Sequence, residues 1–403
     1  MKNKHLRKFT LLLAVALTVM VTAFWGLRGS SWTRWDYQIL DLFFQKSVKD
    51  GHGPKISPRI SLITLTEETK GYFGQTILDR TVFADINNNL ASLGIEATAY
   101  DIIFVLKSNE TSDTYFKDSL KNLKKVYLPI GLNVDESAPP FKLDERIFFD
   151  RIKPFIGAPI ETGTSDPFVG SPYLMQYQPF FEEAHNTGHI NIETDADGVY
   201  RQLTLLIQVD SGYLPALALS IFLDHAGIPL EKIEVHWGNE IRIPALPGSR
   251  LVEDVVIPID RRGRTYIPFV QFWEEEKRNF KQVPIHYFLT LFEDLDTHDS
   301  LKEFFKDNFV FIGDVSLGSK DIGQTPLEDR VPLMTLQASI LNGLLNNTFY
   351  KPRTLTQTIG LILSIAVLLF LSTLPKSSWF LFGCGGFLLL TLIGWAWPNV
   401  AST

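Results

Sequence analysis

The sequence has very little cysteine, since Cys384 is the only one among 403 residues. No disulfide can therefore form within the chain, and packing alone must hold the fold together. A domain of about 300 residues buries enough apolar surface to be stable without covalent cross-links. An oxidising compartment permits disulfides but does not require them, so their absence leaves the location open.

The central part of the chain has no net positive charge. The net charge is −7, yet both ends are basic, so residues 29–352 are more acidic than the whole chain. Recognition of phosphates requires the opposite charge. Nucleic acid is therefore not an expected partner.

Three stretches lack charged residues altogether: residues 9–27, 355–374 and 379–397. Each is as long as the roughly 20 helical residues that cross a bilayer core of about 30 Å. A helix also satisfies every backbone polar group inside hydrocarbon. We predict that these stretches are three transmembrane helices and that the lipid bilayer is a partner of the chain.

The basic residues predict the orientation in the membrane. Four Lys and Arg residues lie in segment 1–8, which predicts a cytoplasmic N-terminus, an outer segment between the first two helices and a C-terminus outside. A cleaved signal peptide ending near Val21-Thr22-Ala23 is the alternative for the first run. Phe24-Trp25 and Arg28 are typical of an interfacial anchor and favour a retained helix.

The first half of the outer segment alternates between strand and helix patterns. Apolar spacing and the cap-forming Gly94 predict the following elements: strand 59–65, helix 79–93, strand 95–104, helix 112–123 and strand 125–131. This β-α-β-α-β order predicts a parallel sheet with crossover helices. We expect one large mixed-sheet α/β domain. The aromatic stretch 32–44 after the first run either follows the membrane interface or begins a helix that leads into the domain.

The second half reads differently. Residues 187–209 predict a hairpin around the turn Asp195-Ala196-Asp197-Gly198, and further hairpin-like strands follow over 232–270. The remaining predicted elements are helix 214–225 ended by Gly227, strand 308–313 and helix 335–345. Residues 132–185 show no clear periodicity and receive no assignment.

An ordered set of short blocks within residues 36–350 resembles the CHASE2 family, an extracytoplasmic sensory domain of bacterial membrane receptors. The blocks are Arg59–Leu65, Glu67, Arg80, Leu90, Leu93, Gly94, Asp101–Phe104, Gly188–Asn191, Asp195, Asp197–Val199, Arg201, Phe309–Gly313, Asp321, Thr325-Pro326 and Ala338–Leu345. The chain departs from the family at Thr66, where Asp is frequent, and at Phe73–Thr76, where a Trp-Pro-Trp-like element is frequent.

The resemblance implies a multi-pass protein of the bacterial inner membrane whose main domain is periplasmic. Such domains feed a cytoplasmic output, either a class III nucleotide cyclase or a kinase. Three spans would leave the C-terminus outside, so we expect either a truncated receptor or a sensor that acts through a partner. Gly383, Gly385 and Gly386 in the last span favour close helix packing and suggest a homodimer.

The loop that follows strand 308–313 is the best candidate for a ligand site, because α/β folds bind ligands at the carboxyl ends of strands. We predict that Asp101, Asp314, Ser316 and Asp321 bind an unknown small-molecule or protein stimulus. The loop lacks the spacing of phosphate-binding glycine motifs. A loop whose Gly and Asp residues only form turns is the alternative.

Asp195, Asp197, Gly198 and Arg201 are predicted to form a turn fixed by an ion pair. A calcium loop starting at Asp195 would have Leu206 at its twelfth position, which cannot bind the ion. His185 and His189 lack the Glu that a zinc protease helix needs. We therefore expect no metal, no cofactor and no catalytic residue.

Two other functions remain open. A membrane-anchored extracytoplasmic hydrolase would lose turnover on mutation of Asp101, Asp314 or Asp321. A docking or assembly protein would co-purify with stable partners.

Overall fold

The computed structural model describes residues 30–134, 145–270, 272–273, 279–294, 296–316, 319 and 321–350. The chain divides into the compact unit Phe44–Tyr350 and a second unit made of Met1–Phe43 and Lys351–Thr403. The three predicted transmembrane runs, including the glycines around Cys384, lie outside the described residues. Among the helices that are described, none is both long enough and apolar enough to span a bilayer.

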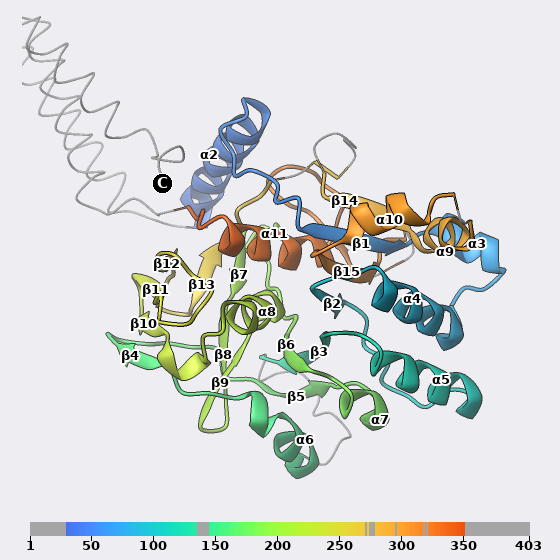
Figure 1. The fold of residues 1–403 in the computed structure, drawn as a ribbon. Coiled ribbons are helices and arrows are strands. Elements are labelled where there is room, and N and C mark those ends of the chain that lie inside the picture. The colour runs from blue at the N-terminus through green and yellow to red at the C-terminus, as the bar shows by residue number, and fades with distance from the viewer. Residues whose placement is uncertain are drawn as a thin grey trace, which may run out of the picture. The chain divides into compact units, whose positions relative to one another are not determined.

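A seven-stranded mixed sheet, the main sheet, forms the centre of the Phe44–Tyr350 unit (Figure 1). Its order is β14-β1-β15-β2-β3, and both β5 and β6 pair with β3. The strands are β1 (Ile60–Leu65), β2 (Ala97–Tyr100), β3 (Val126–Asn133), β5 (Ser171–Leu174), β6 (Asn186–His189), β14 (Lys281–Pro284) and β15 (Phe309–Asp314). Every pairing is parallel except that of β3 with β5. The predicted α/β class with a largely parallel sheet is confirmed.

Helices cover both faces of the main sheet (Figure 1). On one face a shared apolar core joins the sheet to α4 (Arg80–Ser92), α5 (Glu110–Leu120), α9 (Ile285–Glu293) and α10 (His298–Phe305). On the other face lie α8 (Leu217–Ala226) and α11 (Met334–Leu345), which also pack against each other. The remaining helices are α2 (Ser30–Lys49), α3 (Glu67–Phe73), α6 (Glu145–Ile152), α7 (Gln178–Phe181), η1 (Lys153–Phe155) and η2 (Leu230–Lys232).

Helix α4 illustrates how the sequence forms these elements. Its first turn is capped by Asp79, whose side chain accepts a hydrogen bond from the Thr81 amide at 2.9 Å. Ile86 and Leu90, one turn apart, are fully buried against the sheet. Gly94 follows the helix at φ 69°, a conformation that side chains disfavour, which is why this position ends the helix.

Smaller sheets lie outside the main sheet; most of their strands come between β3 and β14 in the sequence, and one pair follows β15. They comprise β4 (Ile160–Thr162), β10 (Glu234–His236), β11 (Glu240–Ile243) and β12 (Val255–Pro258) in one sheet, β7 (Gln202–Thr204) with β13 (Arg264–Tyr266), β8 (Leu206–Val209) with β9 (Gly212–Pro215), and β16 (Ile322–Gly323) with β17 (Val331–Pro332). The strands predicted within 232–270 therefore exist, but the last two, β12 and β13, pair with β11 and β7 instead of forming a hairpin with each other.

The predicted hairpin 187–209 is wrong. Its first arm is β6, which joins the main sheet beside β3, and the actual hairpin is β8 with β9. Long-range packing decides this outcome. Gly188 lies so close to α8 that a Cβ there would stand 2.6 Å from the Leu217 Cα, so only glycine lets β6 pass beneath that helix.

Two predicted segments have different bounds in the structure. The strand expected over 95–104 ends at Tyr100 as β2, because the chain turns toward the carboxyl edge of the sheet at Asp101. The predicted aromatic stretch lies within α2, so it forms a helix, which was one of its two interpretations.

Candidate functional site

The carboxyl edge of the main sheet gathers the acidic residues that were predicted as ligand contacts. Asp101 follows β2, and its amide donates to the Ile312 carbonyl of the neighbouring β15 at 2.8 Å. Asp314 ends β15. Asp321 lies in the loop before α11, where its carbonyl accepts from the Leu333 amide at 2.8 Å. Chain segments far apart in sequence thus place three carboxylates at one edge.

One cation of the described residues joins this edge. The Lys70 ammonium lies 3.4 Å from an Asp314 carboxylate oxygen and donates to the Ser316 hydroxyl at 2.5 Å. Lys70 belongs to α3, whose N-cap is Thr66; its hydroxyl accepts from the Thr69 amide at 3.1 Å. Thr66 therefore performs the capping role that the Asp frequent in the resembled family would also fill.

The charges at this edge are poorly compensated. Burial raises the pKa of Asp101 to about 8, and the nearby Asp321 carboxylate contributes. Burial also raises the pKa of Asp321, with a further contribution from Asp314. The pKa of Tyr200 is raised by burial and then by Asp321, which places this phenol beside the cluster.

This arrangement can bind ligands through hydrogen bonds. With a pKa of about 8, the Asp101 carboxyl favours its protonated form at neutral pH and could donate a hydrogen bond to a ligand, while the Asp314 carboxylate could accept one. In the described part of the chain, no group of three His, Cys, Asp or Glu side chains has the geometry of a metal site. The structure brings Asp101, Asp314, Ser316 and Asp321 to one place, and their contact with a ligand stays a prediction.

The second predicted constellation forms a buried ion pair of its own, separate from the contacts of Asp101, Asp314 and Asp321. The Arg201 side chain is 1% exposed, and its Nη1 lies 3.1 Å from Asp195 Oδ2 and 2.8 Å from Asp197 Oδ1. Gly198 supplies the turn with φ 84°. Burial raises the pKa of Asp195 despite its bond to Arg201, whereas the same arginine lowers the pKa of the more exposed Asp197.

A short segment connects the carboxyl edge to α2. It begins at Asp321, continues through β16 and accepts the Tyr200 amide at the Gln324 carbonyl, 2.8 Å away. At its end, the Pro326 carbonyl accepts a hydrogen bond from the Gln45 side chain of α2 at 2.8 Å. Six residues thus join the acidic cluster to a helix that begins at Ser30.

The two ends of the unit also touch each other. The Phe44 ring of α2 packs edge-on against Tyr350, with ring centres 4.8 Å apart, and against Phe269 at 5.7 Å. Phe44 and the Tyr350 hydroxyl are buried. The helix that enters the unit and the segment that leaves it therefore meet in one aromatic contact.

The amino edge of the main sheet carries a different set of charges, none of which was predicted. Glu96, just before β2, bonds Lys124 at 2.6 Å, Arg250 at 3.0 Å and His225 Nδ1 at 3.1 Å. Burial alone would raise the pKa of Glu96, but these three bonds outweigh it and lower the pKa to about 2. Each partner comes from a different element, so no local pattern in the sequence could reveal the network.

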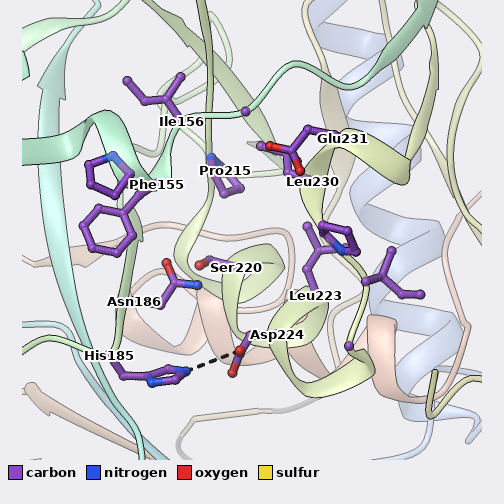
Figure 2. Close-up of a pocket in the computed structure, with 15 residues that line it drawn as sticks. Phe155, Ile156, His185, Asn186, Pro215, Ser220, Leu223, Asp224, Leu230 and Glu231 are labelled. Carbon is purple, nitrogen blue, oxygen red and sulfur yellow. Dashed lines mark hydrogen bonds and ion pairs between the residues drawn. The ribbon is translucent and has the colours of Figure 1, made fainter. Parts of the chain in front are cut away.

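Asp224 of α8 anchors a second group at this edge. Its Oδ2 accepts from Lys125 at 2.5 Å and from the Tyr127 hydroxyl, and its Oδ1 lies 3.3 Å from His185 Nε2. Figure 2 shows Asp224 and His185 at one side of a cavity of about 470 Å³.

Comparison with known proteins gives one match. The family model described as CHASE2 domain matches residues 15–374. None of the curated proteins and none of the solved structures matches the chain.

Proposed function

The chain belongs to the CHASE2 family of extracytoplasmic sensory domains, and from this premise we propose that it is the signal-input part of a bacterial transmembrane receptor. The match over residues 15–374 carries the proposal, because it takes in the whole Phe44–Tyr350 unit and extends into the apolar runs on both sides. The stimulus arrives outside the cytoplasm, and the output is a class III nucleotide cyclase or a kinase supplied by a further segment or by a partner.

The proposed receptor sits in the inner membrane through the runs 9–27, 355–374 and 379–397. The length and lack of charge of these runs support this placement. The basic segment 1–8 supports a cytoplasmic N-terminus, which puts the α/β unit in the periplasm.

In this proposal the stimulus acts at the carboxyl edge, on Asp101, Asp314, Ser316 and Asp321. Poorly compensated charges cluster at functional sites, which supports this choice. A ligand shifts a receptor between two conformations by binding one of them more tightly. A ligand that neutralises these carboxylates would favour the conformation in which they lie close together.

The segment from Asp321 to Pro326 offers a path for that shift to reach α2 through Gln45. The contact of Phe44 with Tyr350 couples α2 to the chain that leads into the second apolar run. Movement of the Asp321–Pro326 segment would thus shift α2 relative to the chain that follows Tyr350, and these are the two segments that lead toward the membrane.

Cysteine labelling tests the proposed topology, because Cys384 is the only native cysteine. In a Cys384→Ser background, Val252→Cys places a thiol at a side chain that is 100% exposed in the α/β unit. We expect a membrane-impermeant maleimide to label this variant in intact spheroplasts. Ser377→Cys, in the short link expected to be cytoplasmic, is the matched control and should be labelled only after lysis. Labelling of Ser377→Cys alone in intact spheroplasts would overturn the orientation.

A further inference from the structure

The cavity at the amino edge is a second candidate binding site. It has a volume of about 470 Å³, within the range of roughly 300–1,000 Å³ that small-molecule sites occupy. It lies between η1, the start of β6, one face of α8 and the segment that leads into η2 (Figure 2). The cavity is separate from the acidic cluster, because it opens at the opposite end of the strands.

The floor of the cavity carries an unused hydrogen-bonding group. Ser220 and Asp224, one turn apart on α8, both line the cavity. Ser220 is 3% exposed, and its hydroxyl makes no hydrogen bond to any described residue. The Ser220 hydroxyl is not enclosed by the protein but is accessible in the cavity, so it can form a hydrogen bond with a ligand there.

Two carboxylates face the cavity from different sides. Figure 2 shows Glu231 across the cavity from Asp224 and His185. Glu231 makes no ion pair within the described residues, and Asp224 Oδ1 has only the 3.3 Å contact with His185. Neither Lys nor Arg is among the described residues that line the cavity, but Lys125 already pairs with Asp224 Oδ2 at 2.5 Å. The negative charge without an ion pair is therefore that of Glu231, while Asp224 Oδ1 offers a further acceptor. The site is therefore suited to a cationic ligand.

About half of the lining surface is apolar. The apolar walls are formed by Phe155, Pro215, Leu223, Ile228 and Leu230. Apolar walls with a few convergent polar groups are typical of sites that orient a small molecule. A ligand that fits must carry positive charge at its ends and an aliphatic body between them.

We propose that this cavity binds a short aliphatic polyamine, with putrescine as the simplest probe. One ammonium group donates to Glu231, and the other donates to Asp224 Oδ1 and the Ser220 hydroxyl. The alkyl chain contacts the apolar wall near Leu223. The binding stands on the cavity itself, and only the view of the polyamine as a stimulus rests on the proposed sensory function.

Calorimetric titration of the purified full chain in detergent tests the ligand class. Putrescine should bind saturably, butylamine about tenfold more weakly because it lacks one charge-assisted bond, and butyrate not at all. The proposal is overturned if putrescine gives no binding at millimolar concentration, or if butyrate binds as tightly as putrescine. Membrane orientation does not enter this measurement, so its outcome is independent of the labelling experiment.

Two pairs of matched variants test the site. Glu231→Gln and Ser220→Ala should each weaken putrescine binding about tenfold. The controls are Glu303→Gln, at an exposed position of α10, and Ser339→Ala, whose buried hydroxyl lacks a described partner. Both should bind putrescine as the parent does. Ser220→Ala breaks no side-chain hydrogen bond to a described residue, so the melting temperature of this variant should not fall. Equal affinity of the cavity variants and their controls would place the amine elsewhere and overturn the site.

Discussion

At the amino edge of the main sheet, Glu96 is bonded by Lys124, His225 and Arg250, whereas at the carboxyl edge Asp101 faces the carboxylate of Asp321. Glu96 is buried and Asp101 is half-buried. The pKa of Glu96 is lowered to about 2 because the bonds outweigh the cost of burial, and the pKa of Asp101 is raised to about 8 because nothing offsets it.

The charges at the two edges have opposite effects on the stability of the fold. Compensated charges at the amino edge lock α8 and the segment around Arg250 to the ends of the strands. At the carboxyl edge, ionisation of Asp101 beside Asp321 weakens the folded state, and charges of this kind are enriched at functional sites.

Breaking the amino edge should have the largest effect. Glu96→Gln should lower the free energy of unfolding by about 2 kcal/mol, because it removes the buried carboxylate that Lys124, His225 and Arg250 bond. Solvent screens part of the loss, since the Lys124 and Arg250 side chains are 56% and 58% exposed. Denaturant unfolding of the full chain measures this loss, with Glu303→Gln as the exposed control. A loss no larger than that of the control would contradict the role of the network.

The pH dependence of that loss has a definite sign. The folded pKa of Glu96 is depressed, so its contribution to stability is fully present above the ordinary value of 4.5 and is lost as the pH falls toward 2. The difference between parent and Glu96→Gln should therefore shrink over this range.

Relieving the carboxyl edge should act in the opposite direction. The folded pKa of Asp101 is raised, so the stability of the parent should fall as the pH rises from about 3.8 to about 8. Asp101→Asn should remove this slope and raise the free energy of unfolding by roughly 1–2 kcal/mol at pH 8, since solvent at the half-buried carboxyl screens part of the effect. Thermal unfolding at several pH values measures it, with exposed Asp299→Asn as the control. A pH slope that persists in Asp101→Asn would assign it to another group.

The sequence predicted what local patterns encode. Phe309–Ile312 is a continuous apolar run, and Ile60–Leu65 is largely apolar and fully buried, because helices cover both faces of the strands; such runs are readable without a structure. Because α/β folds bind ligands at the carboxyl ends of strands, the predicted strand ends identified Asp101 and Asp314 as candidates for one site. Lys70 was missed although it follows β1 on α3, since its ion pair depends on the register of β1 with β15.

Other features lie beyond local patterns. The bond of Gln45 with Pro326 joins positions 281 residues apart. The pairing of β6 with β3 overrides a local turn that looked like a hairpin, because tertiary packing determines which strand a segment joins. The network around Glu96 likewise needs the three-dimensional arrangement of several elements.

The hydrogen bond between Gln45 and Pro326 allows a test of whether the carboxyl edge, and not the amino edge, is coupled to α2. Gln45→Ala removes one hydrogen bond and should cost about 1 kcal/mol, seen as faster amide exchange in the last turn of α2. Asp321→Asn should change exchange in the same turn, and this effect should vanish when Gln45→Ala is also present. Glu96→Gln, at the other edge, is the control. Equal changes in α2 from both edges would show that the Asp321–Pro326 segment is not the path.

The smallest expected effect concerns Lys70, the cation of the described residues that pairs with Asp314. Their side chains are 15% and 25% exposed and 3.4 Å apart, so a double-mutant cycle of Lys70→Met with Asp314→Asn should give a coupling of about 0.5–1 kcal/mol. The exposed pair Arg262 with Asp166, at 50% and 70% exposure, should give less when treated the same way. Lys70 offsets only one of three carboxylates, so Lys70→Met should still cost stability in Asp101→Asn. If its cost disappears there instead, Lys70 compensates the whole cluster and the carboxyl edge is closer to neutral than its pKa values indicate.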